Sequence, residues 1–417
     1  MNTVQTAFNT GASVAVEFCQ VCQSTDLDPI LFLGYLPSVN TMRKQGSTPA
    51  QEASYPANLL FCKQCELVQL GLLVDPNILF PPEYPYTSST TKILRDNFAD
   101  LAQECNQLFT LKSEDLTIDI GSNDGNLLSN FKNKTKVLGI TPEEIGKLAI
   151  ERGIPTVIDF FNKETAARVK EEHGKAKIIT ATNVFAHMED VNEILASIKD
   201  VLTDDGIFVS ESHYLLPLIE TLQYDTIYHE HLRYYSLKSL TYLLNKHGLE
   251  VIHAKAIPTH GGSIRVYAAR PGNYSVQASV KEIQEKEQSL TLDRLKLFKK
   301  EVVKSRSKLY ALISDIKNKD ERIFGVGAPS RASTLITYTG LDDGILDCVV
   351  EIKGSHKVGK YIPGTLIPVV DEAKLFEDQP EYALLLSWHI ADELITNLRN
   401  KGYKGKFIVP LPHPTII

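Results

Sequence analysis

Apolar and polar residues alternate in blocks along most of this chain. Short apolar segments of strand length are separated by segments with the apolar spacing of amphipathic helices, which predicts a parallel, doubly wound sheet. The pattern occurs twice and therefore predicts two α/β bodies. The strands expected in the first body are 116–120, 136–140, 156–158, 178–182 and 206–210. Those expected in the second are 322–326, 345–350, 383–387 and 406–410.

The segment that precedes the first body has a different pattern. Residues 18–74 contain only short apolar segments, too few for a core of their own. They also contain two CxxC pairs, Cys19/Cys22 and Cys62/Cys65. Because each CxxC turn can present two thiolates to one tetrahedral ion, the spacing predicts a structural zinc site with four sulfur ligands. Four buried or redox-active cysteines are the alternative.

Two further segments interrupt the alternation. Residues 75–91 are rich in Pro and Tyr, which predicts a loop ahead of a helix at 92–108. Residues 282–319 are dense in Lys and Glu and almost free of Gly and Pro, which predicts a long solvated helix or helix pair between the two bodies. The expected domains are 1–74, 75–280 and 281–417.

Composition restricts the class of protein. The chain has 417 residues, of which 43% are hydrophobic and 23% charged, as in soluble globular proteins of several domains. No segment approaches the length of a membrane span and the N-terminus lacks the pattern of a secretory signal, so a cytoplasmic protein is expected. The net charge of −7 and the lack of a dense Lys/Arg block argue against nucleic acid as a partner.

The first expected strand runs into a glycine turn, Asp119-Ile-Gly-Ser-Asn-Asp-Gly125. Gly121 allows a tight turn and close approach to a ligand, Gly125 allows helix and strand to pack, and Asp119 can accept from an ammonium or hydroxyl group. The turn is not the GxGxxG of dinucleotide enzymes and favours a cationic ligand such as S-adenosyl-L-methionine. The cofactor contacts expected in this turn are Asp119, Gly121, Asn123, Asp124 and Gly125.

The second expected strand ends without the acidic residue that would hold a ribose. Thr141 occupies this position, so Glu143 or Glu144 would have to reach back, or other groups would hold the ribose. After the third strand, Asp159 and Phe160 are candidates for an acid and a ring beside an adenine, and two core phenylalanines, Phe160 and Phe161, are the alternative.

Residues 224–231 read Tyr-Asp-Thr-Ile-Tyr-His-Glu-His. Proton removal from a carbon beside a ketone needs a base and a group that tunes its pKa, and a histidine with a neighbouring Glu or Tyr supplies both. His229, Glu230 and His231 could instead bind a metal or form a satisfied polar cluster, although their spacing is not the HExxH of zinc enzymes.

A second glycine turn, Gly325-Val-Gly-Ala, follows an expected strand and leads to Ser330 and Arg331. A glycine turn at a helix N-terminus beside a guanidinium can bind a diphosphate. A dinucleotide is the rival ligand.

Together these motifs resemble the S-adenosylmethionine-dependent sugar C-methyltransferases over nearly the whole chain. The resemblance rests on the two CxxC pairs, Tyr84-x-Tyr86-x-Ser88-Ser89, Asp119 to Gly125, Asn183-Val-Phe-Ala-His187, Tyr228-His-Glu-His231, His260-Gly-Gly-Ser263 and Gly325-Val-Gly-Ala-Pro-Ser-Arg331. It implies a small zinc-binding N-terminal domain, a central Rossmann-like class I methyltransferase domain and a second, C-terminal Rossmann-like domain that helps to bind a sugar nucleotide.

The resemblance also implies an activity. This is methylation at C3 of a nucleotide-linked 4-keto-6-deoxy sugar, with a dTDP carrier expected, in branched-chain deoxysugar biosynthesis. His231 matches the base that removes the C3 proton to give an enediolate. The other positions matched to the catalytic pocket are His187, Tyr84, Tyr86, Tyr228 and Glu230. The expected substrate contacts are Asn183, His229, His260, Ser330, Arg331, Trp388 and His389. For Asn183 a simple loop cap is the alternative, and for Trp388 a place in the core.

Two other hypotheses remain at this point. An NAD-dependent sugar-nucleotide epimerase or oxidoreductase would use the Gly325 turn, but GxGxxG and a YxxxK pair are missing. A zinc-containing binding protein with a degenerate methyltransferase domain is kept open by Thr141, while Gly121, Gly125 and the histidine cluster argue against it. A monomer or dimer is expected.

Overall fold

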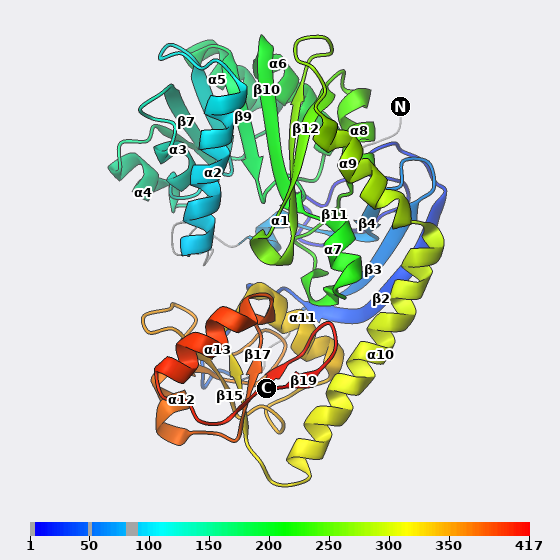
Figure 1. Cartoon of the computed structure of the whole chain (residues 1–417), viewed down its shortest axis with the longest axis vertical. Coiled ribbons are helices and arrows are strands. Elements are labelled where there is room, and N and C mark those ends of the chain that lie inside the picture. The colour runs from blue at the N-terminus through cyan, green and yellow to red at the C-terminus, as the bar shows by residue number, and fades with distance from the viewer. Residues whose placement is uncertain (1–4, 49–51, 81–90) are drawn as a thin grey trace.

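The computed structural model describes residues 5–48, 52–80 and 91–417. A seven-stranded sheet and a six-stranded sheet form two bodies, and a curved four-stranded sheet lies beside both (Figure 1). The predicted α/β fold class is confirmed.

The seven-stranded sheet has the order β12-β13-β10-β9-β6-β7-β8. Its strands are β6 (Leu116–Ile120), β7 (Lys136–Thr141), β8 (Thr156–Ile158), β9 (Ala176–Thr182), β10 (Leu202–His213), β12 (Glu250–Ile257) and β13 (Ser263–Ala269). All pairs are parallel except those that β13 makes with β10 and β12. The five expected strands are present, whereas the hairpin β12–β13 lies where no strand was expected.

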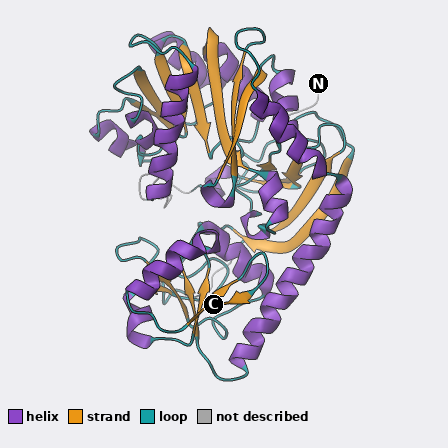
Figure 2. Ribbon diagram, in the orientation of Figure 1, coloured by secondary structure: helices purple, strands orange, loops and turns teal. Residues whose placement is uncertain are grey.

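Helices cover both faces of this sheet (Figure 2). They are α2 (Lys92–Leu108), α3 (Asn126–Ser129), α4 (Gly146–Glu151), α5 (Lys163–His173), α6 (Val191–Val201), α8 (Leu237–Lys246) and α9 (Ala278–Lys286). A further helix, α7 (Leu215–Glu220), follows β10 and packs mainly with the core of the C-terminal body. The apolar side of α2 packs with Ile207 and Val209 of β10, whereas α5, α6 and α8 pack with Ile118 and Phe208 on the other face. Every residue of β6 and β9 is buried, as expected for strands covered on both sides.

The N-terminal sheet is antiparallel, in the order β11-β4-β3-β2. Its strands are β2 (Leu27–Pro37), β3 (Ser54–Cys62), β4 (Val68–Leu70) and β11 (Arg233–Tyr234). A separate pair joins β1 (Ser13–Ala15) to β5 (Leu72–Val74), and the expected loop at 75–91 begins with a helical turn, α1 (Pro76–Leu79). Most of the buried apolar residues of β2 and β3 belong to the core cluster of the C-terminal body. The small apolar content of this segment is therefore supplemented by residues distant in sequence.

The C-terminal sheet has the order β16-β15-β14-β17-β18-β19 and is parallel except at β19. Its strands are β14 (Ile323–Val326), β15 (Cys348–Glu351), β16 (Val369–Asp371), β17 (Tyr382–Leu385), β18 (Lys406–Val409) and β19 (Thr415–Ile416). Its helices are α11 (Ser330–Thr339), α12 (Ala373–Asp378) and α13 (Ala391–Asn400). The four expected strands are present, and β16 and β19 extend the sheet.

The Lys- and Glu-rich segment forms a helix pair, α9 and then α10 (Leu292–Lys317). The second helix, α10, runs alongside the N-terminal sheet and the C-terminal body (Figure 1). The Thr291 side chain accepts from the Arg294 amide and caps α10. The expectation of a solvated helix is wrong for one face, because an apolar stripe that includes Leu295, Phe298 and Leu309 is buried in the C-terminal core. No helix of the described residues combines the length and the apolar character needed to cross a membrane.

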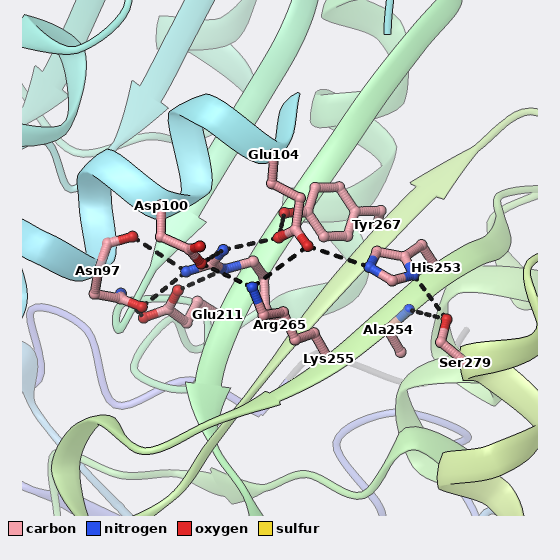
Figure 3. Close-up of polar contacts among 10 residues, drawn as sticks. All are labelled: Asn97, Asp100, Glu104, Glu211, His253, Ala254, Lys255, Arg265, Tyr267 and Ser279. Carbon is pink, nitrogen blue, oxygen red and sulfur yellow. Dashed lines mark hydrogen bonds and ion pairs between the residues drawn. The ribbon is translucent and has the colours of Figure 1, made fainter. Parts of the chain in front are cut away.

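A buried ionic network ties α2 to the hairpin β12–β13 (Figure 3). Arg265 of β13 is fully buried and lies 3.1 Å from the Glu211 carboxylate of β10. It also lies 3.0 Å from Asp100 and 2.9 Å from Glu104 and donates to Asn97, all of α2. A charge inside a sheet hairpin is tolerated here because every direction around it offers an acceptor.

Removal of this charge tests the role of the network. Arg265→Met is expected to lower the free energy of unfolding by about 3–5 kcal/mol, because Glu211 would stay buried without its partner. Lys255→Met removes a partly exposed cation that contacts the same acids, and a loss of about 1 kcal/mol or less is expected. Urea denaturation followed by circular dichroism measures both, and equal small losses would contradict the expectation.

Candidate functional site

The expected site residues of the central body lie at the carboxyl ends of its parallel strands. Strand β6 lies between β7 and β9, so the chain order reverses there, and ligands of open α/β sheets bind at such a switch point. The glycine turn follows β6, Asn183 and His187 follow β9, and His213 ends β10. The edge therefore brings together groups from three strands.

The glycine turn has the backbone that its glycines allow. Gly121 and Gly125 have φ angles of 74° and 76°, and a Cβ at Gly121 would lie 2.3 Å from the Val184 side chain. Asn123 also has a positive φ, of 49°. Asp124 is buried, and its carboxylate accepts a 2.9 Å hydrogen bond from the Arg152 guanidinium. This ion pair fixes the turn to the segment after α4.

Asp119 lies inside the end of β6 and is almost completely buried. Its carboxylate accepts a 2.6 Å hydrogen bond from the Thr180 hydroxyl. Burial raises the pKa of Asp119 to about 7, and the nearby Glu211 charge acts in the same direction. A cation placed beside this carboxylate would restore its ionised form.

An acidic side chain from the following turn contacts the end of β7. The Thr141 hydroxyl donates to the Glu143 carboxylate, which brings Glu143 back to the strand end, whereas Glu144 pairs with Lys147. Of the two residues considered for the ribose position, Glu143 is thus the one whose side chain contacts the end of β7.

Asp159 and Phe160 follow β8. The Asp159 carboxylate accepts from Thr165 and Arg168 of α5, at 3.2 and 3.0 Å. The Phe160 ring is 39% exposed and makes an edge contact with Phe8, so it is not a core phenylalanine.

His231 has one ring nitrogen fixed by the backbone. Its Nδ1 lies 2.8 Å from the Thr226 carbonyl oxygen, and because a carbonyl only accepts, Nδ1 carries the hydrogen. Burial lowers the pKa of His231 to about 4. At neutral pH the Nε2 atom is therefore an unprotonated acceptor.

Aromatic and imidazole rings surround His231. The ring of Tyr228 lies 4.2 Å from it, that of His187 5.0 Å and that of His213 5.7 Å, between centroids. Burial lowers the pKa of His187 and His213 well below the usual range, and raises that of Tyr228 well above it. His213 was not expected from the sequence; its position at the carboxyl end of β10 is the signal that could have found it. Its Nδ1 has no hydrogen-bond partner among the described residues.

The other two members of the 228–231 motif turn toward different neighbours. His229 faces β3, where its Nε2 lies 3.2 Å from the Pro56 carbonyl and its ring contacts Tyr55. Glu230 is buried and accepts a 2.6 Å hydrogen bond from Asn40, which lies in the loop after β2.

Asn40 also connects the site to the C-terminal glycine turn, because its side-chain oxygen accepts a 2.9 Å hydrogen bond from Ser330. Beside this contact, the Lys357 ammonium donates to the Ala328 carbonyl at 2.7 Å. Burial lowers the pKa of Lys357, while the charges of Glu351 and Glu230 oppose that shift. Sequence pattern gave no signal for Lys357, which lies in a loop of ordinary composition.

Arg331 is also at this junction, with Trp388 and His389 close by. Its guanidinium pairs with Asp225, the Trp388 indole donates to the same carboxylate, and His389 accepts from Arg331. His260 has a positive φ of 56°, and burial lowers its pKa to about 4.

Three expected residues remain. Asn183 has a positive φ of 58°, and its backbone N–H donates to the backbone carbonyl of Glu211 at 2.7 Å. Tyr84 and Tyr86 lie outside the described residues. The described chain stops before them at Phe80, whose ring lies 5.9 Å from that of His187.

The four paired cysteines form one cluster away from these histidines. Their sulfur atoms all lie within 4.8 Å of one another, with 3.4 Å for Cys19–Cys65 and for Cys22–Cys62. Zn–S bonds of about 2.3 Å in a tetrahedron require sulfur separations of about 3.8 Å. The sulfur positions therefore fit one four-sulfur metal site. Cys105 and Cys348 are buried elsewhere.

Three family models match successive parts of the chain. "Putative zinc binding domain" matches residues 19–80, "Methyltransferase domain" matches 93–254, and "C-methyltransferase C-terminal domain" matches 258–412. The cysteines, the glycine turn and the C-terminal turn each lie within one of these matches.

Individual proteins match as well. C-methyltransferase NovU of Streptomyces niveus is 30% identical over 409 residues, which cover 96% of this chain and 97% of NovU. Among solved structures, a methyltransferase from Anabaena variabilis matches 43% of this chain and 86% of its own at 16% identity, with a TM-score of 0.34. A magnesium protoporphyrin IX methyltransferase from Synechocystis matches 42% of this chain and 82% of its own at 12% identity, with a TM-score of 0.33. On the nearly full-length match, this chain belongs to the C-methyltransferase family that includes NovU.

Proposed function

We propose that this enzyme transfers a methyl group from S-adenosyl-L-methionine to C3 of a dTDP-linked 4-keto-6-deoxy sugar. One observation carries the proposal: a neutral His231, fixed through Nδ1, lies at the carboxyl edge of the sheet among groups that can donate to an oxyanion. A carbon beside a ketone is acidic enough for such a base.

In this proposal His231 Nε2 takes the proton from C3, the C3–H electron pair forms a double bond between C3 and C4, and the π pair of the C4 carbonyl moves onto its oxygen to give an enediolate. The Tyr228 hydroxyl is the donor to the developing oxyanion, since burial keeps it protonated. Burial also keeps His187 uncharged, so it would act as a neutral donor or acceptor in the same pocket. Glu230, held by Asn40, fixes the loop and offers a carboxylate to a sugar hydroxyl.

The residues around the glycine turn suit the proposed cofactor. Asp119 offers a carboxylate to a cationic ligand and Glu143 offers one at the end of the adjacent strand. Asn123 and Gly121 shape the turn, and Phe160 has an exposed ring for an adenine. S-adenosyl-L-methionine, when bound, supplies an electrophilic methyl group.

The C-terminal glycine turn is proposed to hold the diphosphate of the sugar nucleotide. Ser330 begins α11, and the Lys357 ammonium lies beside the turn. We also propose that the chain is divided into domains 1–74, 75–280 and 281–417. The substrate would then bind between the second and the third of these domains. The four-cysteine cluster is proposed to hold a structural zinc ion, because a closed shell of sulfurs leaves no position for substrate.

Replacement of the base is the direct test of the proposed reaction. His231→Gln is expected to abolish both methylation and solvent deuterium exchange at C3 of a dTDP-linked 4-keto-6-deoxy sugar, a loss of at least about 100-fold, by mass spectrometry. His229→Gln is the matched control, because His229 faces Pro56, and it is expected to retain exchange. Exchange at the wild-type rate in His231→Gln would exclude this base.

Cofactor affinity is expected to depend on pH through Asp119. Its carboxyl group has a pKa of about 7, so acidification protonates it and removes the charge that attracts a cation. Between pH 8 and pH 6 the ionised fraction falls about tenfold, and the Kd for S-adenosyl-L-methionine is expected to rise by a similar factor. Calorimetric titration of Asp119→Asn should give weak, pH-independent binding, whereas Asp159→Asn should retain the pH dependence.

Metal content tests the cysteine cluster separately. Purified protein is expected to contain about one zinc per chain, and Cys62→Ser is expected to lose the metal and part of its thermal stability. Cys105→Ser changes a buried cysteine outside the cluster and should keep full zinc content. An intact wild-type fold without stoichiometric zinc would exclude the metal.

A further inference from the structure

A buried ion pair joins the central body to the C-terminal body. Asp225 lies in a 3-10 turn, Tyr224–Thr226, that precedes the histidine motif, and its side chain is fully buried. Arg331 of α11 donates to both of its carboxylate oxygens at 2.8 Å, from Nε and Nη2. The two residues come from segments 106 positions apart in the sequence.

Further groups from both bodies complete this cluster. Trp388 Nε1 donates to Asp225 at 2.7 Å, and the Arg331 guanidinium carbon lies 5.0 Å from the indole ring. Arg331 also donates to Gln223 at 3.2 Å and to His389 Nδ1 at 3.1 Å. These contacts use Nε, both Nη2 hydrogens and one Nη1 hydrogen, so four of the five Arg331 donors bind protein groups.

The turn that contains Asp225 continues directly into the group that orients His231. Thr226 is the next residue, and its carbonyl oxygen accepts the Nδ1 hydrogen of His231 at 2.8 Å. The backbone N–H and the hydroxyl of Thr226 both donate to the Gln223 carbonyl oxygen, at 3.1 and 2.8 Å. These two bonds hold Thr226, and with it the Thr226 carbonyl, in place. A shift of Asp225 therefore moves the acceptor that sets the His231 tautomer.

We propose that the Asp225–Arg331 pair, completed by Trp388, is a positioning device that fixes the tautomer and orientation of His231 from the C-terminal body. This role rests on His231 acting as the base of the proposed reaction. Asp225, Arg331 and Trp388 act through Thr226 and are positioning residues, not catalytic ones.

This role accounts for the position of Arg331 better than a diphosphate contact does. A guanidinium that already forms a bidentate pair in a buried site gains little from a second anion and would have to break existing bonds to reach it. Buried ion pairs contribute little net stability but fix geometry. Here the geometry that is fixed is one carbonyl next to the proposed base.

The variants are chosen to change the pair without removing the surrounding core. Arg331→Lys keeps the charge but loses the bidentate contact. Asp225→Asn keeps the shape, and Trp388→Phe keeps a ring but removes the indole donor. Arg399→Lys is the matched control, because the Arg399 guanidinium carbon also lies near an aromatic ring, 4.6 Å from that of Phe407, and its donors bind the Tyr403 and Gly405 carbonyls, which are not part of this cluster.

Two measurements on the full chain separate positioning from general damage. Solvent deuterium exchange at C3 of a dTDP-linked 4-keto-6-deoxy sugar is expected to fall about 10- to 100-fold in Arg331→Lys and Asp225→Asn, with less loss in Trp388→Phe. The Kd for S-adenosyl-L-methionine should change by less than about twofold, since the cofactor residues are untouched. Histidine ¹⁵N NMR of the substrate-free protein, with His231 assigned by its loss in His231→Gln, should show the Nδ1–H tautomer in wild type and a mixed population in Arg331→Lys.

The outcomes distinguish this proposal from the proposed function. Wild-type exchange rates and an unshifted His231 resonance in both Arg331→Lys and Trp388→Phe would overturn the positioning role, even if His231→Gln abolishes exchange. A tautomer shift in Arg331→Lys together with full exchange in His231→Gln would support positioning and refute His231 as the base. If Asp225→Asn does not fold, the other two variants and the Arg399→Lys control decide the result.

Discussion

Hydrogen bonding of residues 223–235 to the N-terminal sheet, the central body and the C-terminal body is the constraint on which the rest of the molecule depends. The N-terminal sheet gains its fourth strand from Arg233 and Tyr234, and the C-terminal body is held through Asp225. Tyr235 bridges to the segment that leaves β10 of the central sheet. One stretch of chain thus sets the relative position of three bodies, and the histidine motif lies in its middle.

The buried arginines around this stretch show how it is held. Arg233 is almost completely buried and donates to Gln20, within the first CxxC turn, and to the Glu189 carbonyl, which lies just before α6. Arg265 binds acids of two elements in the same way. A guanidinium has five donors in a fixed plane, so one side chain can fix several loops at once where an apolar side chain would fix none.

Local pattern was enough to predict the parallel strands other than β16, and the cysteine cluster, because apolar runs and CxxC spacing are properties of neighbouring residues. It could not predict β13, since the buried Arg265 interrupts its apolar run and is explained only by Asn97 and Glu211. The pairing of Asp225 with Arg331 was missed for the same reason. Thr141 stands where an acidic residue was expected for the cofactor ribose. The hydrogen bond that joins Glu143 to Thr141 depends on the turn after β7, which the sequence pattern does not define.

The charge balance of the pocket explains why an ion pair, and not a lone arginine, stands beside the histidines. Burial lowers the pKa of His213, His231 and His389, and the Arg331 charge lowers each of them further. A neutral imidazole can accept a proton, but the imidazolium that results is then repelled by any uncompensated cation nearby. Because Asp225 neutralises Arg331 in a bidentate contact, that repulsion is reduced when the base becomes charged. The same carboxylate that holds the turn in place therefore also makes proton transfer to His231 less costly.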